Sequence, residues 1–229
     1  MNWLIDIDQQ LLLAINGWHA PWADTLMWYI SASWTWIPLY LVLAGLLVWR
    51  FGWKRAFLML VVIGCAVGLS DWFSTLLKHT ICRLRPTYEP ALAGMVHTVR
   101  GYTGGMYGFP SSHAANTMSV ALIFSLLYQH PSPHDRRQTT SKSPWLLLLW
   151  VAANCWSRMY LGVHYPGDIL VGLMVGAALA FPAYKVCLWL QRWEWVEPSC
   201  RTAADVRQDA ASCSSESAAC EAASPTDGS

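Results

Sequence analysis

The feature that most constrains this chain is a series of long segments with almost no charged side chains. Residues 25–49 contain no Asp, Glu, Lys or Arg, and a helix that crosses a bilayer needs about 20 consecutive apolar residues. Four later segments have the same character, namely residues 56–77, 112–128, 144–161 and 169–190. Because a helix satisfies its own backbone hydrogen bonds in lipid, the sequence predicts an all-α, polytopic membrane bundle of about five transmembrane helices.

The overall composition agrees with a membrane protein. Hydrophobic residues make up 55% of the 229 residues and charged residues 13%, whereas soluble domains carry about 25% charged residues. The formal net charge is +1 and the chain has no basic tail, so nucleic acid is not an expected partner. The expected partners are membrane lipids.

The N-terminal segment differs from the five apolar segments because it is amphipathic. In residues 1–16, the apolar side chains near one helical face are Leu4, Leu11, Leu12 and Ile15. Gly17 and Pro21 then predict the end of this helix. We expect residues 1–24 to form an interfacial segment at the membrane surface. A helix that packs against the bundle fits the pattern equally well.

Basic residues in the loops predict the orientation. Loops 50–55 and 130–143 carry three Lys or Arg residues each, and such residues concentrate on the cytoplasmic side. With five spans, both loops lie on that side, the N-terminus is outside and the C-terminus is inside. After Glu197 the chain is rich in Ala, Ser, Asp and Glu, so residues 193–229 are expected to form a disordered cytoplasmic tail. Residues 25–192 then form the membrane domain.

Three groups of polar residues fall at the outer ends of the predicted spans. In the first group, Lys78 and Arg85 lie seven residues apart where the second span ends. Both cations can therefore point the same way and bind a phosphoryl group, Arg through a planar fork and Lys as a point charge. Basic residues that simply anchor the end of a membrane helix are the alternative.

The second group follows a glycine-rich loop and directly precedes a predicted helix. It comprises Pro110, Ser111, Ser112 and His113. Free backbone N–H groups at the positive end of a helix dipole bind anions, and Ser is also a preferred N-cap residue. Only His113 has no purely local explanation.

The third group contains Arg158, His164 and Asp168. His164 and Asp168 flank a Pro-Gly turn, so the carboxylate can accept a hydrogen bond from one ring nitrogen and leave the other free to attack. Ionisable residues next to membrane spans usually belong to a functional site. A transporter pathway would also place such residues in a bundle, although it would not gather them at one level.

The three groups resemble the three signature motifs of the type 2 phosphatidic acid phosphatase (PAP2) superfamily, in the same order. The matching segments are Lys78-(six residues)-Arg85-Pro86, Pro110-Ser111-Ser112-His113 and Ser157-Arg158-(five residues)-His164-(three residues)-Asp168. The superfamily pattern has Gly at the position of Ser112. This Ser adds a small side chain and keeps the backbone donor.

The resemblance implies a lipid phosphatase that needs no metal or cofactor and that works through a phosphohistidine. His164 would be the nucleophile, Asp168 would orient it, and His113 would act as general acid and then general base. The residues implied to bind the phosphoryl group are Lys78, Arg85, Ser111, Ser112 and Arg158. The active site would lie at the outer face of the plasma membrane, which is periplasmic in a bacterium.

The sequence does not identify the lipid substrate or the group that accepts the phosphoryl group. The Gly104–Phe109 stretch and Asp71 resemble a subgroup of small bacterial members of the superfamily, and this resemblance favours a polyprenyl diphosphate. Phosphatidate, phosphatidylglycerophosphate and a lipid A phosphate are alternatives. A phosphotransferase on the same scaffold would pass the phosphoryl group to a lipid or sugar instead of water. The oligomeric state is also open.

Two further patterns lie outside the motifs. Asp71 falls within the second span, where we expect a structural hydrogen bond below the site rather than a catalytic role. Gly64 with Gly68, and Gly172 with Gly176, have the spacing that lets membrane helices approach closely. Packing within one bundle explains these pairs at least as well as dimerisation.

Overall fold

The computed structural model describes residues 2–130 and 144–191, and these residues form helices and no strand. The long helices are α1 (Asn2–Asn16), α2 (Pro21–Ser31), α3 (Ile37–Phe51), α4 (Trp53–Ile81), α5 (Ser112–Gln129), α6 (Pro144–Tyr160) and α7 (Pro166–Gln191). The predicted all-α class is confirmed. The predicted tail, residues 193–229, lies outside the described residues.

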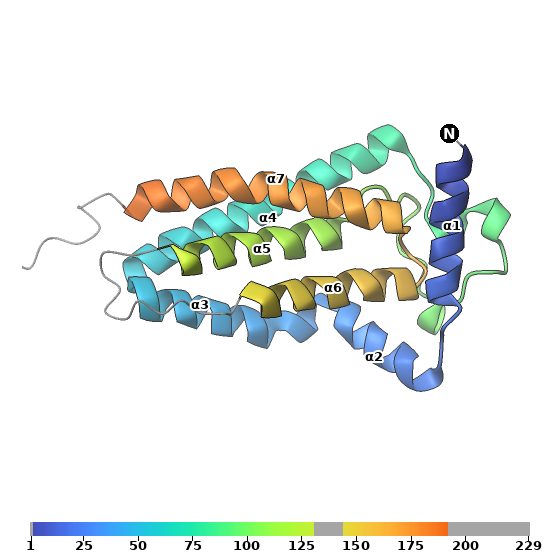
Figure 1. Ribbon diagram of the computed structural model, residues 1–229, viewed down its shortest axis with the longest axis horizontal. Coiled ribbons are helices and arrows are strands. Elements are labelled where there is room, and N and C mark those ends of the chain that lie inside the picture. Colours follow the sequence, from blue (N-terminus) through green and yellow to red (C-terminus); the bar gives the residue numbers. More distant parts are fainter. Residues whose placement is uncertain (1, 131–143, 192–229) are drawn as a thin grey trace, which may run out of the picture. The chain divides into compact units, whose positions relative to one another are not determined.

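Helix α5 forms the centre of the bundle, since it packs against α4, α6 and α7 (Figure 1). Its contact with α7 is close because α7 has glycines there. A Cβ atom at Gly172 would lie 2.5 Å from the carbonyl oxygen of Ser111, and one at Gly176 would lie 2.2 Å from that of Ala115. Packing within one bundle is thus confirmed for this pair. A Cβ at Gly64 or Gly68 would meet no atom within 4 Å.

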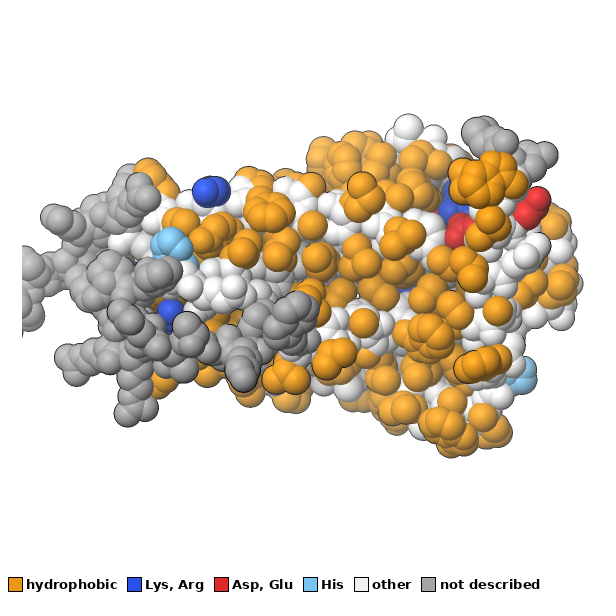
Figure 2. All heavy atoms as spheres, in the orientation of Figure 1, with side chains coloured by type: hydrophobic (Ala, Val, Ile, Leu, Met, Phe, Trp, Pro, Cys, Tyr) orange, Lys and Arg blue, Asp and Glu red, His pale blue; other side chains and the backbone are white. Residues whose placement is uncertain are grey.

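Three of the described helical segments are long and apolar enough to cross a membrane, namely Ser33–Phe51, Trp53–Ile81 and Pro166–Gln191. Helices α5 and α6 have 18 and 17 residues and do not meet this criterion, so the count of five spans stays a prediction. Figure 2 shows hydrophobic side chains over most of the visible face of the bundle and charged side chains near its ends. This distribution is what a bilayer requires of a helical bundle.

The prediction of one continuous span over residues 25–49 is wrong. Helix α2 ends at Ser31, Ala32 is extended, and α3 begins at Ile37 after a short 3₁₀ turn. Pro38 is in the first turn of α3, where it displaces no intrahelical hydrogen bond, and it therefore begins a helix instead of bending one. The expected boundary between residues 24 and 25 consequently falls inside α2.

Helix α1 crosses the ends of α6 and α7 (Figure 1). Leu12 is fully buried against the bundle, whereas Leu4 and Leu11 are exposed. The helix therefore packs on the bundle and also keeps an apolar outer face. Its placement at the membrane surface remains a prediction.

The hydrogen bond expected for Asp71 is absent from the part of the chain that the structure describes. The side chain is exposed on α4, where its carboxylate interacts electrostatically with Lys78 two turns further along the same helix. Sequence hydropathy does not show which helix face is covered by protein, so the exposure of Asp71 could not be predicted from its place in an apolar segment.

Candidate active site

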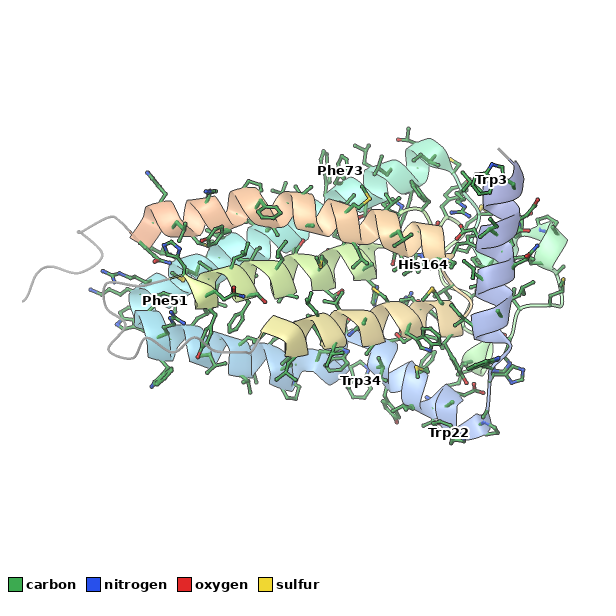
Figure 3. The ribbon with its side chains drawn as sticks, viewed as in Figure 1. Trp3, Trp22, Trp34, Phe51, Phe73 and His164 are labelled. Carbon is green, nitrogen blue, oxygen red and sulfur yellow. The ribbon has the colours of Figure 1, made fainter. Side chains whose placement is uncertain are left out.

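The segments that carry the eight predicted site residues meet at the end of the bundle that α1 crosses. They are the last turns of α4 and α6, the first turns of α5 and α7, and the loops that follow α4 and α6. Figure 3 shows His164 at this end, between α7 and α1. The three motifs are thus gathered from four helices, as the order of the spans requires.

His164 is almost completely enclosed, with only 2% of its surface exposed. Its Nε2 lies 3.1 Å from Nη1 of Arg85, and because a guanidinium can only donate, Nε2 is the acceptor. In a neutral ring the proton is then on Nδ1, which lies 3.6 Å from Oδ2 of Asp168. Nε2, which carries the lone pair, therefore faces the guanidinium of Arg85, and Nδ1 faces the carboxylate of Asp168.

Asp168 is fully buried in the first turn of α7. Its Oδ1 accepts a hydrogen bond from Nη1 of Arg83 at 2.8 Å, and its Oδ2 accepts one from the backbone N–H of Tyr165 at 3.0 Å. Its backbone oxygen accepts from the N–H of Ser111 at 3.0 Å. Asp168 thereby joins the second and third motifs as well as standing behind His164.

Arg85 is fixed by the glycine-rich stretch. Its Nε donates to the carbonyl of Tyr107 and its Nη1 to the carbonyl of Val163, each at 3.1 Å. A Cβ atom at Gly104 would lie 3.0 Å from Nη1 of Arg85, and one at Gly108 would lie 3.0 Å from its Cγ. The glycines are therefore needed to let the loop close over the arginine.

The second motif holds both of its serines in defined roles. The Ser111 hydroxyl oxygen accepts from the backbone N–H of Ala114 at 3.5 Å and so caps α5. The Ser112 hydroxyl accepts from Nζ of Lys78 at 2.6 Å. The departure from the Gly of the superfamily pattern thus gives Lys78 a hydrogen-bond partner.

His113 and Arg158 line a cavity of about 260 Å³ that His164 does not reach. The break in the helix after Ser31 opens this cavity, and Trp28, Tyr102 and Leu161 supply its apolar walls. Nη1 of Arg158 donates to the Ser31 hydroxyl at 2.6 Å, while its buried Nε has no partner among the described residues.

The electrostatics of the site favour an anion. Burial lowers the pKa of His164 well below its ordinary value, and Arg85, Arg158 and Lys78 lower it further. Burial, followed by the charge of Arg158, also lowers the pKa of Arg85. Cations that weaken one another in this way are stabilised by a ligand with two negative charges, such as a phosphate monoester.

Sequence reasoning missed two residues of this network. Arg83 lies between Asp168 and Asp8, with Nη2 2.5 Å from Oδ2 of Asp8. Burial alone would lower the pKa of Arg83, but the carboxylates of Asp168 and Asp8 outweigh it and raise that pKa. Arg83 is two residues before the predicted Arg85, whereas nothing local in α1 indicates Asp8, which is 75 residues away in sequence.

The fold and the site together define a helical membrane protein in which a buried histidine lies between an arginine and a carboxylate. The family model described as "PAP2 superfamily" matches residues 58–192. The chain therefore belongs to the PAP2 superfamily, and the resemblance seen in the motifs is confirmed.

Named relatives and a solved structure agree with this assignment. A lipid A 4'-phosphatase from Bacteroides thetaiotaomicron is 34% identical over 83% of this chain and 83% of its own length. One from Porphyromonas gingivalis is 31% identical over 87% of this chain and 80% of its own length. The crystal structure of a PAP2-type phosphatidylglycerolphosphate phosphatase from Bacillus subtilis has a TM-score of 0.61 at 24% identity, covering 84% of this chain and 90% of that one. The predicted class, a membrane phosphatase, is confirmed.

Proposed function

We propose that the protein hydrolyses a phosphate monoester or diphosphate of a membrane lipid through a phosphohistidine on His164. One observation carries this proposal. The Nε2 lone pair of a buried imidazole faces the guanidinium of Arg85, while Nδ1 faces the carboxylate of Asp168. A neutral histidine held between a carboxylate and cations is arranged to attack a phosphorus atom whose oxygens the cations bind.

In the first step, the phosphoryl oxygens bind Arg85, Arg158 and Lys78, and Arg85 exchanges its contact with Nε2 for one with the substrate. Nε2 then attacks phosphorus, and the bond from phosphorus to the ester oxygen breaks. The leaving oxygen takes a proton from His113, which lines the adjoining cavity. Positive charge that develops on the ring of His164 is stabilised by Asp168.

In the second step, His113 is neutral and accepts a proton from water. The resulting oxygen nucleophile attacks phosphorus, the bond from phosphorus to Nε2 breaks, and inorganic phosphate leaves. His164 and His113 return to their starting protonation states. The Ser112 hydroxyl holds Lys78 toward the phosphoryl group throughout.

The position of His113 supports the proposal that the cavity receives the leaving group. An in-line displacement puts the departing oxygen opposite the nucleophile, and the cavity is lined by His113 and not by His164. At about 260 Å³, the cavity fits a ring-sized head group and not a whole lipid, since pockets for drug-sized ligands begin at roughly 300 Å³. Its aromatic and hydroxyl lining suits a sugar ring.

A phosphorylated glycolipid of the lipid A type is therefore the first candidate substrate. The relatives at 34% and 31% identity, both named lipid A 4'-phosphatases, support it. A polyprenyl diphosphate is the second candidate, because a putative undecaprenyl-diphosphatase from Escherichia coli is also among the relatives. The glycine-rich stretch no longer favours it, since Gly104 and Gly108 are explained by their packing on Arg85.

The test is phosphate release by the purified protein, in nanodiscs, from lipid A, undecaprenyl diphosphate, phosphatidylglycerophosphate and phosphatidate. We expect the highest kcat/KM for lipid A and no turnover by His164→Ala. The matched control is His19→Ala, which removes an exposed histidine whose ring stacks on His97. Turnover by His164→Ala at the wild-type rate would refute the proposed function.

We also propose that the site faces the outside of the plasma membrane. Cys82 is an exposed free thiol at the end of α4, next to the site, and it can report the orientation directly. A membrane-impermeant thiol reagent should label Cys82 in intact cells and should reach Cys200 only after permeabilisation. The reverse pattern would place the chemistry in the cytoplasm.

A further inference from the structure

We infer that Asp8 of helix α1 is a positioning residue for catalysis, acting through Arg83 on Asp168. This inference rests on the proposed role of His164 as the nucleophile. It assigns a part in the reaction to a helix that lies outside the three motifs. None of the proposed phosphate ligands is in α1.

Charged hydrogen bonds link Asp8 through Arg83 to Asp168. Oδ2 of Asp8 accepts from Nη2 of Arg83 at 2.5 Å, and Nη1 of the same guanidinium donates to Oδ1 of Asp168 at 2.8 Å. The two nitrogens of one planar fork are thereby divided between two carboxylates. Asp168 in turn stands 3.6 Å from Nδ1 of His164.

A second contact ties Asp8 to the turn that carries Asp168. Oδ1 of Asp8 accepts from the backbone N–H of Gly167 at 2.7 Å. A Cβ atom at position 167 would lie 2.9 Å from Oδ2 of Asp8, so the turn and the carboxylate fit closely. Both oxygens of Asp8 are therefore used within the site, and its side chain is only 13% exposed.

The guanidinium of Arg83 depends on its partners for its position because its side chain is 26% exposed. Among the described residues it hydrogen-bonds to the two carboxylates, and the ring centroid of Tyr165 lies 4.2 Å from its Cζ. Without Asp8, the guanidinium can turn toward solvent and leave Oδ1 of Asp168. A buried carboxylate that loses its charged partner is destabilised, and Asp168 would then no longer be held in the orientation that His164 requires.

The prediction is a loss in kcat with little change in KM, because neither Asp8 nor Arg83 is among the proposed phosphate ligands. Outer residues that orient metal ligands typically contribute on the order of 10- to 100-fold, and by analogy we expect Asp8→Asn to lower kcat by about that factor. Arg83→Lys keeps a positive charge but loses the fork, and it should cause a similar loss.

The decisive experiment is a double-mutant cycle on the full-length protein in nanodiscs. It measures kcat and KM for phosphate release, together with the melting temperature, for the wild type, Asp8→Asn, Arg83→Lys and the double variant. If Asp8 acts through Arg83, the double variant should be no slower than the slower single variant, since residues in one network do not act additively. The inference would be overturned if the loss of kcat in the double variant equalled the product of the two single losses. An effect on KM alone would also overturn it.

Two control variants distinguish the positioning role of Asp8 from the packing of α1 on the bundle. Asp6→Asn removes an exposed carboxylate from the same helix and should leave kcat unchanged. Leu12→Ala removes a fully buried contact of α1 and should lower the melting temperature with less effect on kcat than Asp8→Asn. An equal or greater loss of kcat in Leu12→Ala would show that only the docking of α1 matters.

Asp8→Glu provides a rescue. It retains the carboxylate and should recover part of the activity lost in Asp8→Asn, and an Asp8→Glu protein as slow as Asp8→Asn counts against the inference. If the wild-type protein itself releases no phosphate from any lipid, the proposed function fails, whereas an active wild type with a fully active Asp8→Asn refutes only the role of Asp8.

Discussion

The two halves of the site differ in how firmly they are held. Around the proposed nucleophile, His164 and Asp168 are almost fully buried and belong to a network that extends through Arg83 to Asp8. Around the proposed acid, His113 is half-buried and faces a cavity of about 260 Å³.

This difference corresponds to two chemical tasks. The attack on phosphorus is the same for every phosphate ester, so a rigid arrangement stabilises its transition state without reorganisation. The leaving group varies between lipids, and a cavity between helices can accept head groups of different shape. Substitutions in the first half should therefore impair all substrates, and those in the second half should discriminate among them.

The largest expected effect in the leaving-group half comes from His113→Ala. A lipid alkoxide departs poorly without a proton, so its hydrolysis should slow by about 100- to 10,000-fold, the usual contribution of one positioned acid. An aryl phosphate leaves more easily, and its burst of phosphohistidine formation in rapid quench should be much less affected. Equal losses for alkyl and aryl esters would mean that His113 binds the substrate or has a structural role, and that it does not protonate the leaving oxygen.

A smaller and more selective effect is expected for Trp28→Ala, which removes one aromatic wall of the cavity. We expect kcat/KM for lipid A to fall by roughly 5-fold, since a stacked aromatic ring contributes on the order of 1 kcal/mol. Hydrolysis of a small phosphate ester should be nearly unchanged. An equal loss of kcat/KM for all substrates would show that the cavity does not bind the head group.

The surroundings of the proposed nucleophile also predict the charge state of His164. Because burial and the nearby cations lower the pKa of His164, its ring should stay neutral as the pH falls through 6.5, where an ordinary histidine becomes protonated. Nitrogen NMR of histidine-labelled protein checks this. Arg85→Gln removes one of these cations and should raise the pKa of His164. A ring already protonated at pH 6.5 in the wild type would contradict the account.

No effect is expected from a chelator. Within residues 2–130 and 144–191 there is no group of three His, Cys, Asp or Glu side chains placed to hold a metal ion, and the carboxylates of Asp8 and Asp168 are joined by Arg83. Phosphate release in excess chelator should match that in buffer. This prediction would be wrong if the chelator abolished activity and added magnesium restored it.

The sequence predicted the features that depend on local pattern. Long uncharged segments require helices in lipid, and the motif spacings brought His164, Asp168 and His113 to the ends of those helices. The Gly172 and Gly176 spacing indicated close packing because only the absence of a side chain permits it.

Features that depend on tertiary contact were not predictable in this way. The break at Ala32 occurs in an uncharged segment, where hydropathy gives no signal and Pro38 can either bend or begin a helix. Asp8 takes its importance from Arg83, which is distant in sequence. The glycine-rich stretch suggested a substrate because its packing partner, Arg85, is visible only in the folded chain.

The central claim is that His164 carries the phosphoryl group, and a tryptic peptide tests it most directly. Cleavage after Arg158 and Lys185 gives residues 159–185, in which His164 is the only histidine, whereas His113 falls in residues 101–136. In rapid-quench samples of wild-type protein with lipid substrate, mass spectrometry should find alkali-stable, acid-labile phosphate on residues 159–185, formed and lost at the rate of turnover. Phosphate on residues 101–136, or steady turnover without any phosphorylated peptide, would contradict the account.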